Sequence, residues 1–195
     1  MFWARIRHPN TVPRDARETK SLSGVRGGMT WYEEAVEALH DGGVEVVAYL
    51  PDSVVAPLIE LVEADDRFRA VPVAREEEAV GILSGAWLGG RRGALVCQTS
   101  GLSNTFNAIG SLSKPWGLPF VGIVSRRGDL GEHNLAQVSA GYGMPRILDD
   151  MGVRNGRMDA STDVGQVVRL AADTAFSTED PYVLLADVTL TGGKP

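Results

Sequence analysis

Short blocks of apolar, often β-branched residues alternate along the chain with longer stretches in which apolar residues recur at helical spacing. The pattern begins at Thr30, because Thr30 and Glu33 have the spacing of a capping box, and a helix is predicted from there to the glycines at 42 and 43. Strands are predicted at 44–50, 70–73, 94–97, 118–124 and 182–186. Further helices are predicted at 54–63, 76–88, 145–151 and 162–176, the last capped near Ser161 or Thr162, and another runs from a loop at 99–104 to about Ser113.

This alternation predicts an α/β fold, a parallel sheet flanked by helices on both faces, because continuous apolar blocks are typical of strands buried on two sides. Pro72 favours a strand end or an edge strand, since proline cannot donate to the ladder. Ligands in such folds bind beyond the carboxyl ends of the strands. The loops of interest are therefore 51–53, 74–78, 98–104 and 125–137, the last within a polar loop expected to extend to 140.

Acidic residues outnumber basic ones in this 195-residue chain, whose net charge is −6. An acidic chain is a poor candidate for nucleic-acid binding, so no nucleic-acid partner is expected. Residues 1–28 depart from this balance, because six basic residues against two acidic ones give +4 and leave −10 for the remainder. We expect 1–28 to be a poorly ordered basic arm or a start-site extension, and 29–195 to be the folded domain.

Several kinds of site have no support in the sequence. No run of 18 apolar residues occurs, so no membrane helix is expected. Dinucleotide, phosphate-loop and nucleophile-elbow motifs are absent, and the three scattered histidines predict no metal-binding residues. Cys97, the single cysteine, cannot form an internal disulfide, and we interpret it as a small buried core residue. A lone thiol is typical of a reducing compartment, so we expect a cytoplasmic protein.

Two loops carry candidate chemistry. Arg75 and the glutamates at 76–78 follow a predicted strand, where acidic residues favour the dipole of the coming helix. Three successive carboxylates cannot share one solvent-facing side, so one of them should point toward the ligand crevice. The segment 98–104 combines small polar residues with backbone N–H groups at a helix start, which can bind a polar ligand. An ordinary strand-to-helix connection remains the alternative for that segment.

Residues 75–90 (REEEAVGILSGAWLGG) together with 98–104 (QTSGLSN), 50–53 (LPDS) and 141–153 resemble the pyrimidine-binding (PYR) domain of thiamine-diphosphate enzymes. The resemblance covers about residues 30–190. The most similar subgroup contains the α subunit of sulfopyruvate decarboxylase, followed by phosphonopyruvate decarboxylase. It implies that 29–195 is a PYR domain.

The resemblance also implies roles for particular residues. Glu76 is the glutamate at the family's interval before Gly85, and it would hydrogen-bond the cofactor's pyrimidine N1′ as the catalytic residue, exchanging a proton with that ring. The cofactor then acts as electron sink for loss of CO₂ from a 2-keto acid. The implied cofactor-binding residues are Glu76, Gln98, Thr99, Ser100, Gly101 and Asn104. The implied substrate residues are Arg127 and either Asp52 or Ser53.

The family holds the diphosphate and Mg²⁺ through a G-D-G motif in a second, PP domain, whereas this chain has Gly128, Asp129 and Leu130. The resemblance therefore implies a separately encoded PP-domain (β) subunit, in an α₂β₂ or larger heteromer. The implied activity is half of a thiamine-diphosphate-dependent carboxy-lyase that converts sulfopyruvate to sulfoacetaldehyde and CO₂, or that acts on phosphonopyruvate. A carboligase acting on another 2-keto acid and a non-catalytic PYR-fold binding or regulatory subunit are the alternatives.

Overall fold

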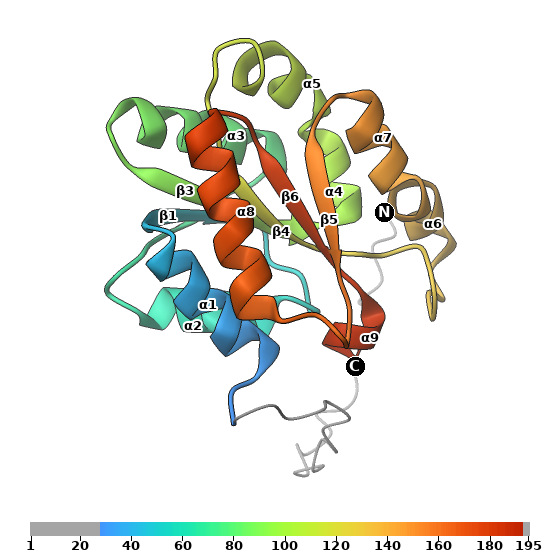
Figure 1. Ribbon diagram of the computed structural model, residues 1–195. Helices are drawn as coiled ribbons and strands as arrows, with labels where there is room; N and C mark the ends of the chain where they lie inside the picture. Colours follow the sequence, from blue (N-terminus) through green and yellow to red (C-terminus); the bar gives the residue numbers. More distant parts are fainter. Residues whose placement is uncertain (1–27, 193–195) are drawn as a thin grey trace, which may run out of the picture.

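The computed structural model describes residues 28–192, so almost all of the expected basic arm lies outside the described residues (Figure 1). Six strands form one sheet, all parallel, in the order β2-β1-β3-β4-β6-β5. Their bounds are Val44–Tyr49 (β1), Arg69–Pro72 (β2), Arg92–Gln98 (β3), Val121–Ser125 (β4), Arg154–Met158 (β5) and Tyr182–Ala186 (β6). The predicted parallel α/β fold is confirmed, and β2 is an edge strand, as its proline indicates.

Helices cover both faces of the sheet (Figure 1). One face packs against α1 (Trp31–Asp41), α2 (Ala56–Ala64) and α8 (Val164–Thr178). The other packs against α3 (Glu76–Leu88), α4 (Thr99–Asn104), a π-helical turn at Ile109–Ser113 and α7 (Met144–Asp150). The remaining helices are α5 (Phe106–Ala108), α6 (Leu135–Tyr142) and α9 (Val188–Thr191). No described helix is long and apolar enough to cross a membrane.

Successive residues of the central strands enter opposite cores. In β3, Ala94 and Val96 pack against the α1–α2–α8 side, whereas Leu95 and Cys97 pack against the α3–α4–α7 side. This is the two-residue period of a strand, with apolar side chains in both directions because both faces are covered. Cys97 is fully buried, which confirms its interpretation as a core residue.

The capping box at the start of α1 is present. Glu33 Oε2 accepts a hydrogen bond from the Thr30 N–H at 2.6 Å, and the Glu33 N–H donates to Thr30 Oγ1 at 3.4 Å. Hydrogen bonds from the backbone and side chain of Thr30 lower the pKa of Glu33. Local sequence therefore determines where this helix begins.

Four sequence predictions were wrong in detail. The polar segment 98–104 is not a loop, because α4 begins at Thr99, directly after β3, and the helical stretch that follows is broken into α5 and the π turn. The loop predicted to reach 140 ends at Asn134, whose side chain caps α6. The α8 helix is capped by Asp163 rather than by Ser161 or Thr162. Strand β5 was missed, because its sequence RNGRM is polar and its edge position lets four of its five residues face partly or fully outward.

Candidate functional site

The carboxyl ends of neighbouring strands bring the candidate residues to one edge of the sheet. Asp52 follows β1, Glu76 follows β2, Thr99 follows β3 and Arg127 follows β4. The charges of Glu76 and Asp52 both reach the thiol of Cys97, near the end of β3, and add to the burial that raises its pKa. Residues far apart in sequence therefore meet at this edge.

Glu76 is the glutamate of the 76–78 run that turns inward. It is only 4 % exposed, although it is the first residue of α3. Glu77 instead pairs with Arg75 at 2.9 Å, and Glu78 reaches back to accept a hydrogen bond from the Ala74 N–H at 3.0 Å. Glu77 and Glu78 therefore interact with residues at the start of α3, and only Glu76 turns toward the crevice.

Two residues of α4 fix the Glu76 carboxylate. Asn104 Nδ2 donates to Glu76 Oε2 at 2.9 Å. Gly101 lies against the other oxygen, because a Cβ added at Gly101 would come within 2.0 Å of Glu76 Oε1. A side chain at position 101 is therefore incompatible with this close approach.

Asp52 lies inward, whereas Ser53 is exposed. The Asp52 side chain is 7 % exposed. Its Oδ1 accepts hydrogen bonds from the Val54 N–H at 3.1 Å and from Ser125 Oγ at 2.9 Å. Of the two alternatives left open by the sequence, the structure brings Asp52 to the site.

Arg127 is held by a glutamate that the sequence analysis did not select. Its Nε and Nη2 donate to the two oxygens of Glu132 at 2.8 and 3.0 Å, a two-point pairing that only a guanidinium can make. Its Nη1 lies 3.9 Å from Asp52 Oδ2. Arg127 and Glu132 are 10 % and 7 % exposed at their side chains, so the pair is largely shielded from water.

Glu132 also organises the loop around Arg127. It accepts hydrogen bonds from the N–H groups of Gly128 at 3.1 Å, His133 at 3.0 Å and Asn134 at 2.8 Å. The hydrogen bonds from Arg127 above all, and those from the N–H groups of Asn134 and Gly128, lower the pKa of Glu132 to about 2. In the sequence Glu132 is one charge among several in a polar loop, and no local pattern distinguishes it from the others.

The remaining predicted residues divide into two groups. Thr99 is fully buried, and its Oγ1 accepts the Arg127 N–H at 3.1 Å, which joins β3 to the Arg127 loop. Gln98 and Ser100 are half-buried, and their side chains form no hydrogen bond with other described residues. The structure thus brings together Glu76, Gly101 and Asn104 as one contact group, and Asp52, Thr99 and Arg127 as a second.

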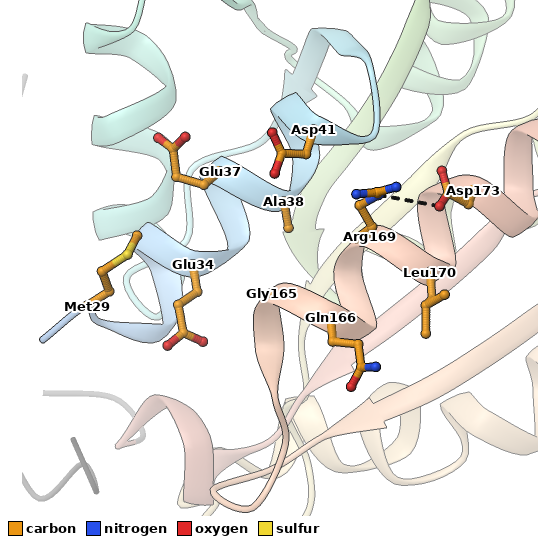
Figure 2. Close-up of a pocket in the computed structure, with 10 residues that line it drawn as sticks. All are labelled: Met29, Glu34, Glu37, Ala38, Asp41, Gly165, Gln166, Arg169, Leu170 and Asp173. Carbon is orange, nitrogen blue, oxygen red and sulfur yellow. Dashed lines mark ion pairs between the residues drawn. The ribbon is translucent and has the colours of Figure 1, made fainter. Parts of the chain in front are cut away.

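Two hollows differ in their relation to these residues. A cavity of about 510 Å³ lies beside the Arg127 loop and is lined by Val54, Arg127, Gly131, His133 and Val188 among others. A second hollow of about 440 Å³ lies between α1 and α8, where Figure 2 shows Glu34 and Glu37 on α1 across from Gln166 and Leu170 on α8. None of the predicted site residues lines this second hollow, so the chemistry is assigned to the strand ends. Among residues 28–192, no group of three His, Cys, Asp or Glu side chains could hold a metal ion.

Comparison with known proteins identifies relatives. No protein-family model matches the chain. It is 34% identical over 159 residues to the sulfopyruvate decarboxylase subunit alpha of Methanococcus maripaludis, a match covering 82% of this chain and 95% of that protein. It is 40% identical over 118 residues to the phosphonopyruvate decarboxylase of Streptomyces viridochromogenes, which covers 60% of this chain but only 29% of that longer protein.

Among solved structures, the chain resembles a 2-oxoglutarate:ferredoxin oxidoreductase from Magnetococcus marinus, with a TM-score of 0.63 and 15% identity. That match covers 84% of this chain and 29% of the other, and it concerns the fold. The resemblance noted in the sequence is confirmed by the curated relatives. The chain belongs to the family of sulfopyruvate decarboxylase α subunits.

Proposed function

We propose that residues 29–195 form the PYR domain of a split, thiamine-diphosphate-dependent decarboxylase that acts on sulfopyruvate or on phosphonopyruvate. The observation that carries the proposal is the inward-turned Glu76, fixed at the carboxyl edge of the sheet by Asn104 and faced by Gly101. A family of non-catalytic binding modules has no need for a carboxylate held in this way. The names of the relatives support the substrate class.

The donor set of the chain fits an aminopyrimidine. Oε2 of Glu76 accepts a hydrogen bond from Asn104, whereas Oε1 packs closely against Gly101 and accepts none from the described residues. A carboxylate in a dry site is the group that can exchange a proton with a ring nitrogen. When bound, thiamine diphosphate would supply the electron sink for loss of CO₂. Glu76 would hold the proton at N1′, while Asn104 keeps its carboxylate in place.

The second contact group suits the substrate. A sulfonate or phosphonate needs a cation, and Arg127 supplies a guanidinium at this edge of the sheet. Glu132 accepts hydrogen bonds from Nε and Nη2, whereas Nη1, 3.9 Å from Asp52 Oδ2, donates no hydrogen bond to the described residues and is the nitrogen that would donate to the anion. Asp52 is the carboxylate that would lie next to the bound substrate.

The proposal includes a partner subunit. The relatives that the chain matches along most of their length are named as subunits. We propose that a separately encoded PP-domain β subunit binds the diphosphate and Mg²⁺, in an α₂β₂ or larger complex. The buried lone thiol of Cys97 agrees with assembly in the cytoplasm.

The test uses the chain purified with its partner subunit from its native cells. Release of CO₂ and sulfoacetaldehyde from sulfopyruvate is measured for the wild type, Glu76→Gln and the matched control Glu77→Gln. General acid–base catalysis contributes about 10²–10⁴-fold, so Glu76→Gln should lower kcat by roughly 100-fold or more with the complex intact. Glu77, paired with Arg75 at the surface, should tolerate the same change. Full activity in Glu76→Gln would rule out the proposed catalytic role.

A further inference from the structure

The cavity beside the Arg127 loop has walls of two kinds. It measures about 510 Å³ and lies among the turn before α2, the segment 126–134 and α9. Val54, Leu130 and Val188 supply apolar surface, whereas Arg127 and His133 bring polar side chains from the segment after β4. Apolar walls with a few polar groups are the usual form of a small-molecule site, so the polar groups decide which ligand fits.

Glu132 is the carboxylate among the described residues that line this cavity, and its oxygens are already occupied. Oε1 accepts hydrogen bonds from Arg127 Nη2 and from the N–H groups of His133 and Asn134. Oε2 accepts from Arg127 Nε and from the Gly128 N–H. A carboxylate has about four lone-pair sites, so Glu132 has no capacity left for a ligand that donates hydrogen bonds.

The polar groups that remain at the cavity are donors. Arg127 Nη1 donates no hydrogen bond to the described residues, and the ring of His133 has no hydrogen bond or ion pair with them. Asn134 Oδ1 caps α6 by accepting the Ala136 N–H at 3.0 Å, which leaves Nδ2 as the unused half of the amide. An imidazole keeps at least one N–H in every protonation state, so each of these three side chains can donate to a ligand.

Arg126 also lines the cavity, but its charge is compensated within the chain. Its Nη2 pairs with Asp129 at 2.6 Å, and its Nη1 lies 3.5 Å from Asp187. The free donors of the cavity are therefore those of Arg127, His133 and Asn134.

A single carboxylate oxygen positions these three residues relative to one another. Oε1 of Glu132 binds the side chain of Arg127 at 3.0 Å, the N–H of His133 at 3.0 Å and that of Asn134 at 2.8 Å. The loop is therefore ordered before a ligand arrives, and binding does not have to supply the free energy of ordering it.

A cavity that offers donors and no free carboxylate fits an anion rich in acceptor oxygens. A sulfonate or phosphonate carries three such oxygens on one tetrahedral atom. We propose that this cavity is the headgroup subsite of the substrate, where His133 and Asn134 Nδ2 donate hydrogen bonds to the sulfonate or phosphonate together with Arg127 Nη1. This inference rests on the proposed function, because that function supplies the substrate class.

The test uses His133→Ala and Asn134→Asp in the complex with the partner subunit. Aspartate caps a helix as well as asparagine does, so Asn134→Asp keeps the start of α6 and replaces only the donor by an oxygen. The matched controls are His40→Ala, at an exposed residue of α1 that packs edge-on against Phe68, and Asn107→Asp, at an exposed residue of α5.

The first measurement is kcat/KM for sulfopyruvate, for phosphonopyruvate and for pyruvate, which has the keto acid group without the headgroup. Hydrogen bonds to charged groups are strong enough that each site variant should lower the preference for the headgroup substrates over pyruvate by about tenfold or more. The controls should keep the wild-type preference. The headgroup substrate with the larger wild-type kcat/KM shows whether the subsite takes a sulfonate or a phosphonate.

The second measurement needs no turnover. Methanesulfonate and methylphosphonate carry the headgroup alone, and binding to the folded complex should raise the midpoint of thermal unfolding above that in sodium chloride of equal ionic strength. His133→Ala and Asn134→Asp should reduce this rise, whereas His40→Ala and Asn107→Asp should retain it.

The inference is overturned if neither probe stabilises the wild-type complex, or if both site variants keep the wild-type preference. An equal loss of activity on all three substrates would also overturn it, because the loop would then serve folding alone. A lower affinity for thiamine diphosphate with the preference unchanged would assign the cavity to the cofactor instead. Turnover that survives Glu76→Gln counts against the proposed function, whereas the two probes report on the subsite by itself.

Discussion

The amide of Asn104 and the carboxylate of Glu76 meet at 2.9 Å, although 28 residues separate them in the chain. Glu76 begins the helix after β2, and Asn104 ends the helix after β3. The contact joins two consecutive crossover units at the carboxyl edge of the sheet, where ligands bind in folds of this kind. It orients a carboxylate that is 4 % exposed and otherwise has Gly101 beside it.

Loss of this hydrogen bond should impair catalysis more than folding. Asn104→Ala is expected to lower kcat of the complex by roughly 10–100-fold, because hydrogen bonds to charged groups contribute about 1.5–3 kcal/mol. Asn107→Ala, an exposed asparagine one turn later, is the matched control and should leave kcat unchanged. Steady-state kinetics measures kcat for both variants, and equal values would refute the orienting role of Asn104.

Gly101 should not tolerate a methyl group. In Gly101→Ala the new Cβ would lie 2.0 Å from Glu76 Oε1, so either the helix α4 or the carboxylate must move. Overpacking of this kind costs about 1–3 kcal/mol of unfolding free energy, measured by urea denaturation, and activity should fall with it. Gly81→Ala in α3 has open space around its Cβ and should be neutral or stabilising by about 0.5–1 kcal/mol. A neutral Gly101→Ala would contradict the close approach of α4 to Glu76.

The Arg127–Glu132 pair predicts a specific pH dependence of stability. The folded pKa of Glu132 is about 2, below its usual value of 4.5, so its ionised form stabilises the folded state above about pH 4.5. This contribution is lost as the pH falls from 4.5 toward 2. Glu132→Gln should therefore lower the unfolding free energy by about 2–3 kcal/mol at pH 7, and the difference from wild type should shrink toward pH 2.

Denaturant titrations of wild type and Glu132→Gln at a series of pH values measure this difference. Glu60→Gln, a change at an exposed residue of α2, serves as the control and should show a small difference that varies little with pH. A Glu132→Gln penalty that is independent of pH would mean that shape, not charge, is the contribution of Glu132.

Cys97 should be inert in the folded protein. Burial, with smaller effects from the charges of Glu76 and Asp52, raises the pKa of its thiol, and the side chain is fully buried. Iodoacetamide at pH 8 should leave the folded chain unmodified and should alkylate it once in urea, because the chain has a single cysteine. Mass spectrometry counts the adduct, and rapid modification of the folded protein would show that β3 opens near the site.

Local patterns in the sequence determined most of the fold. The capping box at Thr30 and Glu33, the bounds of the helix at 76–88 and those of the strand at 182–186 all follow from spacing along the chain, because helices and strands have fixed side-chain periods. Strand β5 was not predicted from the sequence, because a polar edge strand is identified by its pairing with β6 rather than by its composition.

The arrangement of the candidate site was decided by the tertiary structure. Sequence could show that one glutamate of three should turn inward, but the partner Asn104 became visible only when α3 and α4 were packed together. Asp52 is distinguished from Ser53 by the hydrogen bond that it accepts from Ser125, 73 residues away. Arg127 is positioned by its two hydrogen bonds to Glu132. The periodicity of the sequence indicates which side of its helix or strand a residue faces. Which loops end side by side depends on strand order, and only the assembled sheet fixes that order.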